Sequence, residues 1–198
     1  TALSKIISTG AKVLSYDALW EAYETTDIRP DGTIWDIYSN ATKYDPKKDR
    51  AGNYAKEGDA YNREHTTPQS WFKKASPMRT DLFQVFPSDG YVNNKRSSHP
   101  LGETNGEQYK SENGFSKLGQ STTPGYNGTV FEPADEYKGD LARAYFYMAT
   151  RYEDRVGNWS GGVYAQSSYP GLAKWALDMF IRWADKDPVS KKEVDRNN

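Results

Sequence analysis

The sequence predicts an α+β fold, built as a single domain over residues 1–198. A chain of 198 residues has the length of one domain with its own core. Only 36% of the residues are hydrophobic, yet aromatic residues reach 14%, which argues against disorder. Helix-like and strand-like patterns both occur along the chain. We therefore expect a core of helices and short strands that is surrounded by long polar loops.

The first third predicts short helices and one strand. Helices are expected near residues 2–9 and 15–25, the second carrying Leu19, Trp20 and Tyr23. Residues 33–39 alternate apolar and polar side chains and are rich in β-forming residues, which predicts a strand. Residues 40–61 are charged and contain glycine, and they predict an irregular connection.

The second half predicts loops first and then helices. Residues 102–129 are dense in Gly, Ser, Thr and Asn, which favours loop with short strands. Two helices with buried apolar stripes are expected over residues 139–152 and 170–184, with Pro170 in the first turn of the second. The stripes consist of Leu141, Tyr145, Met148 and Tyr152 in the first helix and of Leu172, Trp175, Met179 and Trp183 in the second.

A capping-box pattern from Ser190 to Glu193 predicts the start of a last helix. The sequence ends at Asn198, within about two turns of that start, and an isolated helix so short is marginal. We therefore expect a domain that is clipped at its C-terminus. The chain begins at Thr1 rather than Met, which fits both a processed export product and a trimmed chain.

Composition excludes several classes of site. Cysteine is absent, which rules out disulfides, thiolate zinc sites and thiol nucleophiles. No apolar run approaches the roughly 18 residues of a membrane span, so we expect no membrane span. Separately, the protein is expected to be a monomer. The net charge of −1 gives no general basic field, although residues 63–80 hold four basic residues against one acidic residue.

The most informative segment sets a carboxylate, Glu64, beside His65, one of two histidines, and is followed by Asn93. Glu64 and Asn93 offer hard oxygen ligands, which suit Mg²⁺ or Mn²⁺. His65 fits a general base, because a histidine with its reference pKa of about 6.5 is largely neutral near pH 7. These residue types are typical of a metal-dependent phosphodiesterase.

Neighbouring residues of a regular strand point to opposite faces, so Glu64 and His65 would not converge there. We therefore expect a strand end or a bulge at this point, and hence a distorted hairpin. The segment after Pro87 predicts a short helix that is capped by Ser88 and carries Asn93.

Two arginines are expected to clamp phosphate oxygens, since a guanidinium has the fork geometry for this task. Arg96 lies three residues after Asn93 and would share its helix face, while Arg79 lies in the preceding loop. His99 has no acidic neighbour and is expected to be structural.

Several motifs in the same order resemble the endonuclease I family, bacterial periplasmic and secreted nucleases of the ββα-metal (His-Me finger) group. The matching segments are NREH (62–65), PQSWF (68–72), DL (81–82), Pro87, GYVNNKRS (90–97) and PLGE (100–103), followed by FEP (131–133), KGD (138–140) and ARAYFYM (142–148). The resemblance covers most of the chain. It implies a ββα-metal motif in which a hairpin bears Glu64 and His65 and a short helix bears Asn93.

The resemblance also implies an activity, which is cleavage of DNA, RNA or both with little sequence preference, leaving 5′-phosphate and 3′-hydroxyl ends. By position, His65 corresponds to the general base, and Glu64 and Asn93 correspond to the ligands of one Mg²⁺, which Mn²⁺ or Ca²⁺ can replace. Arg79 corresponds to the phosphate-contacting arginine, and Arg96 is grouped with it as catalytic. A secreted or periplasmic location follows, with the signal peptide absent from this chain.

Four further residues are expected to bind substrate, namely Arg63, Gln84, Lys95 and Arg143. Gln84 stands where many members of the family carry a histidine. Glu132 and Asp140 also fall on family motifs, but no role follows for either. Two alternatives stay open, a catalytically inactive module that binds nucleic acid or another polyanion, and a phosphodiesterase for smaller substrates. An inactive module would be expected to have lost Glu64, His65 or Asn93, and all three are present.

Overall fold

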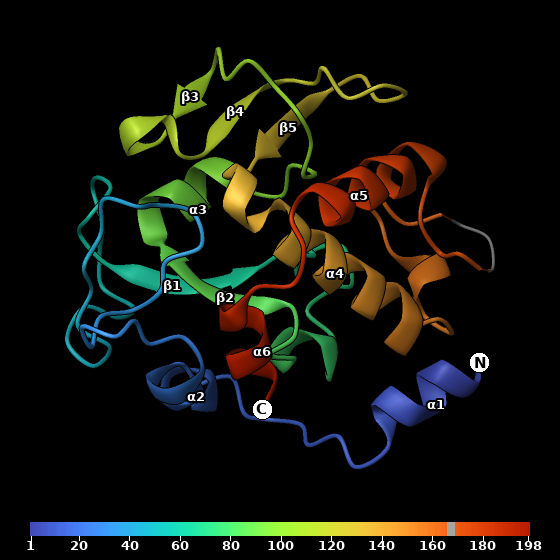
Figure 1. Ribbon diagram of the computed structural model, residues 1–198, viewed down its shortest axis with the longest axis horizontal. Helices are drawn as coiled ribbons and strands as arrows, with labels where there is room; N and C mark the ends of the chain where they lie inside the picture. Colours follow the sequence, from blue (N-terminus) through green and yellow to red (C-terminus); the bar gives the residue numbers. More distant parts are fainter. Residues whose placement is uncertain (166–168) are drawn as a thin grey trace.

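A two-stranded antiparallel hairpin and the helix that follows it lie near the middle of the molecule (Figure 1). The computed structural model describes residues 1–165 and 169–198. The hairpin consists of β1 (Tyr61–His65) and β2 (Val85–Asp89), and α3 (Gly90–Arg96) follows directly and contacts both strands. The strands pair residue for residue, from Tyr61 opposite Asp89 to His65 opposite Val85.

A second antiparallel sheet and a pair of long helices complete the molecule. The sheet has the order β3 (Tyr109–Lys110), β4 (Lys117–Gln120) and β5 (Thr129–Glu132), at the top of Figure 1. The helices α4 (Asp135–Arg151) and α5 (Lys174–Lys186) pack against each other. Antiparallel sheets together with separate helices confirm the α+β prediction.

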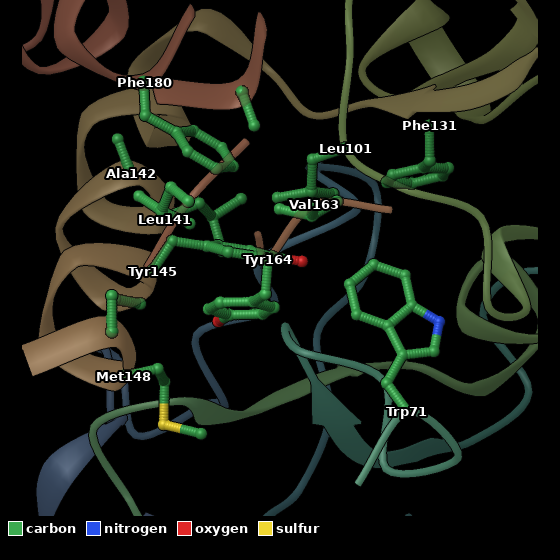
Figure 2. Packing of buried hydrophobic residues seen from close by; sticks show 14 of the residues in the cluster. Trp71, Leu101, Phe131, Leu141, Ala142, Tyr145, Met148, Val163, Tyr164 and Phe180 are labelled. Atoms are coloured by element: carbon green, nitrogen blue, oxygen red, sulfur yellow. The ribbon is translucent and has the colours of Figure 1, made fainter. Parts of the chain in front are cut away.

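The predicted apolar stripes of α4 and α5 form much of the main core (Figure 2). Figure 2 shows Tyr145 of α4 and Phe180 of α5 facing each other, with ring centroids 4.6 Å apart. The α4 helix begins four residues earlier than expected, with Asp135 and Glu136 in its first turn, where acidic side chains favour a helix start.

Pro170 is not part of α5, contrary to the prediction. The segment before the helix instead makes strand-like contacts, since Tyr164 bridges Leu172 and the Ala173 amide donates to the Val163 carbonyl. These contacts hold the chain extended up to Ala173, so the helix begins only at Lys174.

The strand expected over residues 33–39 is also wrong. The carboxylate of Asp36 accepts hydrogen bonds from the amides of Tyr38 and Ser39, which turns the chain locally. Such contacts of a side chain with nearby backbone compete with a strand ladder. Ile34 and Ile37 are nevertheless fully buried, so the apolar positions were predicted correctly although the backbone was not.

The N-terminal region holds α1 (Ala2–Ser8), which contacts α4, and α2 (Ala18–Thr26). The apolar residues expected for α2 do pack inside, where Leu19, Trp20 and Tyr23 join Tyr61 of β1 and Val85 of β2 in a second buried cluster. Helix α2 therefore covers one side of the hairpin.

The last helix, α6 (Lys191–Asn197), begins with the predicted capping box between Ser190 and Glu193. It is anchored by Arg196, whose Nε atom lies 3.0 Å from the Asp27 carboxylate at the end of α2. The Nη2 atom of Arg196 also donates to the Val85 carbonyl at 3.0 Å, which ties α6 to β2. Among the described helices, none is long and apolar enough to cross a bilayer.

Candidate active site

A hollow of about 250 Å³ lies where β1 ends against α3. It is lined by Arg63, Glu64, His65, Pro68, Gln69, Ser70, Lys74, Asn93, Arg96, Ser97 and Ser98. The lining includes the three residues that the sequence predicted as general base and metal ligands. The fold thus brings Asn93 of α3 to the same hollow as Glu64 and His65 of β1.

His65 is held by a hydrogen bond to backbone. Its Nε2 atom lies 2.9 Å from the Arg79 carbonyl oxygen. A carbonyl can only accept, so Nε2 carries the hydrogen and the lone pair of the neutral ring is on Nδ1. Burial lowers the pKa of His65 to about 4, and the nearby charges of Arg79 and Arg63 act in the same direction. The imidazole is therefore neutral near pH 7, with a free acceptor at Nδ1.

Glu64 is buried and keeps one carboxylate oxygen available. Its Oε1 atom accepts a hydrogen bond of 2.7 Å from the Tyr38 hydroxyl and forms an ion pair with Arg96. Burial raises the pKa of Glu64, while the charge of Arg96 opposes that effect. Since the Tyr38 hydroxyl and the Arg96 guanidinium both donate to Oε1, Oε2 is the oxygen that Glu64 can offer to a cation.

Arg96 is fully buried, and its donors are all directed at the protein. Besides Glu64, it donates to the carbonyls of His99 at 3.0 Å, His65 at 2.8 Å and Thr66 at 2.7 Å. A guanidinium bound in this way has no free edge for a substrate phosphate. The structure thus favours a positioning role for Arg96, which fixes Glu64 and the end of β1, over the phosphate contact expected from the sequence.

Asn93 is oriented by a neighbour on β1. Its Nδ2 atom donates to Oδ1 of Asn62 at 2.6 Å. Asn62 lies two residues before Glu64, and residues two apart in a strand share a face. Asn93 uses its amide nitrogen on this contact, so its Oδ1 atom is left as a candidate cation ligand.

The helix that carries Asn93 is capped by Asp89 rather than by the expected Ser88. The Asp89 Oδ1 atom accepts a hydrogen bond of 2.8 Å from the Val92 amide. Ser88 remains the penultimate residue of β2, because the ladder extends to Asp89. Strand and helix therefore meet without a loop, which places α3 directly over the hairpin.

The distorted hairpin that the sequence predicted is not observed. Of the two expected features, a strand end and a bulge, only the strand end is present, because His65 is the last residue of β1. Glu64 and His65 each pair with one residue of β2, and the described ladder contains no bulge. Glu64 contacts Tyr38 and Arg96, whereas His65 contacts Tyr16 and the Arg79 carbonyl. The two side chains thus point to opposite sides of a regular strand, and the hollow extends around the strand end to reach both.

Arg63 and Arg79 are held against aromatic rings. The guanidinium carbon of Arg63 lies 3.6 Å from the centre of the Tyr16 ring and 4.2 Å from that of Trp20. The guanidinium carbon of Arg79 lies 4.0 Å from the Tyr16 ring centre, and its Nε donates to Gln69 at 3.1 Å. Both guanidinium groups therefore lie on the Tyr16 ring, which in turn stacks near the His65 imidazole.

Three residues that were expected to bind substrate, Gln84, Lys95 and Arg143, do not line the hollow. Gln84 is fully buried and braces the loop after β1, bonding to the Met78 carbonyl and the Thr67 amide. Lys95 points to the rings of Tyr91 and Tyr109 and does not line the hollow.

Arg143 is also directed away from the hollow. Its Nε and Nη2 atoms each lie 2.6 Å from an oxygen of Glu193 in α6, and Nη1 donates to the Asp187 carbonyl. The other two family positions are also engaged in the protein, since Glu132 bonds to Lys138 and Asp140 lies within 3.5 Å of Arg143. These contacts connect secondary-structure elements and give Arg143 a structural role.

Three residues that orient the site were not predicted from the sequence, namely Tyr38, Asn62 and Tyr16. Asn62 carried a usable signal, because its place two residues before Glu64 sets both on one face of β1. Tyr38 and Tyr16 come from distant segments, and nothing in their local sequence indicates the contact. Only the tertiary structure identifies them.

The donor atoms fit a hard divalent cation. In residues 1–165 and 169–198, no three acidic or histidine side chains gather into a metal cage. The candidate ligands are one carboxylate oxygen, from Glu64, and one amide oxygen, from Asn93. Mg²⁺ is commonly held by one or two carboxylates and completes its shell with water and phosphate oxygens. Such a sparse oxygen set suits Mg²⁺ better than Zn²⁺, which prefers nitrogen and sulfur.

Comparison with known proteins agrees with the resemblance found in the motifs. The chain is 33% identical over 213 residues to the "Extracellular ribonuclease" of Bacillus amyloliquefaciens, covering 100% of this chain and 64% of that protein. It is 30% identical over 210 residues to the "Extracellular ribonuclease" of Bacillus subtilis (strain 168), covering 98% of this chain and again 64% of the relative. The chain thus spans just under two thirds of these relatives. Residues 1–198 match the family model described as Endonuclease I, and the chain belongs to the endonuclease I family.

Proposed function

We propose that this protein is a Mg²⁺-dependent endonuclease that hydrolyses phosphodiester bonds with little sequence preference. The observation that carries the proposal is the state of His65, a neutral imidazole with its Nε2 hydrogen on the Arg79 carbonyl and its Nδ1 lone pair free. A base of this kind lies at the same hollow as a carboxylate and an amide oxygen. Together these groups make up a minimal site for metal-assisted hydrolysis.

In this mechanism, Nδ1 of His65 takes a proton from the water that attacks phosphorus. The Nε2 contact with the Arg79 carbonyl stabilises the imidazolium that forms, because both ring nitrogens are donors in that state. A positioned base of this type contributes about 10²- to 10⁴-fold in rate. The bond between phosphorus and the 3′-oxygen breaks, and that oxygen takes a proton from solvent water, which gives 5′-phosphate and 3′-hydroxyl ends. His65 returns its proton to solvent.

Cationic groups are proposed to neutralise the charge of the phosphate. Arg79, at the side of His65, is proposed to bind a phosphate oxygen through its Nη atoms. Glu64 and Asn93 would hold Mg²⁺, which when bound neutralises phosphate charge and stabilises the departing oxygen. Arg96 and Tyr38 fix the Glu64 carboxylate, so this ligand is set before substrate arrives.

RNA, DNA or both are the proposed substrates. The family name implies a nuclease, and the two relatives carry the name extracellular ribonuclease, which supports RNA as a substrate and secretion as the location. Contacts with the phosphate backbone of a nucleic acid carry no sequence information. A site that consists of a histidine general base, a metal ion and arginines would therefore cleave many sequences. A monomer remains the prediction for the assembly.

The test is to incubate the protein with plasmid DNA and with structured RNA, each with Mg²⁺ or with EDTA. Cleavage of either polymer that requires Mg²⁺ and leaves 5′-phosphate ends supports the proposal. Binding of both polymers without metal-dependent degradation would instead identify the inactive binding module. Release of phosphate from small diesters alone would identify the phosphodiesterase for smaller substrates.

A further inference from the structure

The contacts around Arg79 form an alternating series of aromatic and cationic side chains. The series runs from Trp20 to Arg63, then to Tyr16, then to Arg79, with guanidinium carbons 4.2, 3.6 and 4.0 Å from the successive ring centres. It begins in the core, because Trp20 is buried and packs edge-on against Tyr61 of β1 at 5.4 Å. It ends at Arg79, whose carbonyl is bonded to His65, a residue that lines the hollow.

Tyr16 is the central member of this series. Its ring contacts both guanidinium groups and lies nearly parallel to the His65 imidazole, at 24° and a centroid distance of 6.0 Å. Its carbonyl accepts a hydrogen bond of 2.8 Å from Arg63 Nη1, which fixes the backbone at this point. One side chain from the N-terminal segment thus touches the proposed base and both nearby arginines.

Arg79 depends on these contacts for its orientation. Its Nε atom is taken by Gln69 and its face by Tyr16. Among the described residues, no acceptor lies within hydrogen-bonding distance of either Nη atom, so that edge remains available to a phosphate. A guanidinium that stacks on a ring keeps its in-plane N–H groups free, which is the arrangement that phosphate binding requires.

We infer that Tyr16 is a positioning residue that holds Arg79 for transition-state contact with the phosphate. The inference rests on the proposed nuclease function. Without the ring, the Arg79 side chain is fixed only at Nε and its Nη edge is free to rotate. Mispositioning of a catalytic group by about 1 Å can cost about 100-fold in rate. Tyr16 acts through its π face, since no described residue hydrogen-bonds its hydroxyl.

The experiment measures kcat and KM for Mg²⁺-dependent cleavage of a defined RNA or DNA. The variants are Tyr16→Phe, Tyr16→Leu and Tyr16→Met, alone and combined with Arg79→Ala. Tyr126→Leu is the matched control, because Tyr126 stacks on Trp175 outside the hollow. Thermal unfolding of each variant checks the fold, and the two aliphatic variants differ in shape so that a defect in one does not decide the outcome.

Tyr16→Phe and Tyr126→Leu should cleave at the wild-type rate, whereas Tyr16→Leu and Tyr16→Met should lower kcat about 10- to 100-fold with little change in KM. In the Arg79→Ala background, the same substitutions should change kcat less than about threefold, because their effect passes through Arg79. The inference would be overturned by an equal loss of kcat in the wild-type and Arg79→Ala backgrounds, or by a wild-type kcat in folded Tyr16→Leu. In either case, His65→Ala still tests the proposed nuclease function separately. A wild-type protein without cleavage would overturn both proposals.

Discussion

The Nε2 atom of His65 lies 2.9 Å from the backbone carbonyl oxygen of Arg79. This hydrogen bond joins the proposed general base to the residue proposed to bind phosphate. The bond fixes the tautomer of the imidazole and directs its lone pair to Nδ1. It also means that the loop carrying Arg79 cannot shift without moving the base.

Replacement of His65 by alanine should abolish the proposed cleavage, lowering kcat by about 10²- to 10⁴-fold. Mg²⁺ binding should persist, because the candidate ligands Glu64 and Asn93 are unchanged. Cleavage assays at neutral pH and calorimetric titration with Mg²⁺ measure the two effects. His99→Ala is the matched control, since only the His99 backbone touches the site, and it should retain full activity. Undiminished cleavage by His65→Ala would remove His65 from the mechanism.

Replacement of Arg96 by leucine should destabilise the fold as well as the site. The change leaves the Glu64 carboxylate buried without its cation, and breaking a buried ion pair in this way costs about 3–5 kcal/mol. Urea unfolding measures the loss. Lys95→Ala on the same helix is the control and should cost less than about 1 kcal/mol, because Lys95 is only half-buried and its ammonium lies over ring faces. A stable Arg96→Leu protein with normal activity would contradict the positioning role.

Replacement of Arg143 by alanine should lower stability without changing substrate affinity. Arg143 joins α4 to α6 through two contacts of 2.6 Å with Glu193, and hydrogen bonds to charged groups contribute about 1.5–3 kcal/mol. The free energy of unfolding should fall by roughly that amount, discounted for partial exposure. KM for nucleic acid should stay constant. A raised KM with unchanged stability would restore the substrate-binding role expected from the sequence.

Replacement of Asp36 by asparagine should change how stability depends on pH. Burial raises the pKa of Asp36 to about 7, against hydrogen bonds from the Tyr38 amide and the Thr42 hydroxyl that favour the ionised form. Since the folded state binds the proton more tightly than the unfolded state, wild-type stability relative to the variant should fall as pH rises from about 4 to 7. The total change should not exceed about 4 kcal/mol.

Urea unfolding of both proteins at several pH values between 4 and 8 measures this difference. Asp31→Asn is a control of opposite sign, because hydrogen bonds from Thr33 lower the pKa of that exposed carboxylate. Relative to Asp31→Asn, the wild type should gain stability as pH rises through the acidic range. A pH-independent difference for Asp36→Asn would show that its carboxyl titrates normally.

The sequence predicted the fold well where periodicity reflects burial. The apolar stripe from Leu141 to Met148 is buried in α4, and the capping box at Ser190 begins α6, because both signals depend on residues within a few positions of one another. It failed over residues 33–39, where Ile34 forms only an isolated bridge with Ile28 and Asp36 bends the chain by bonding to nearby amides. It also placed the start of α5 too early, because pairing between Tyr164 and Leu172 holds that segment extended.

For the site, the sequence by itself determined the chemistry, a carboxylate, a histidine and an amide set within two short motifs. The tertiary structure decided which of the neighbouring side chains serve that chemistry. Arg96 and Gln84 are buried and hold neighbouring segments in place, and Arg143 binds Glu193 of α6. The sequence alone did not distinguish these three residues from residues that are free to bind substrate. Tyr16 reaches His65 from a segment almost fifty residues away. The physical reason is that residue type and local spacing are written along the chain, whereas burial and contact arise only when distant segments pack together.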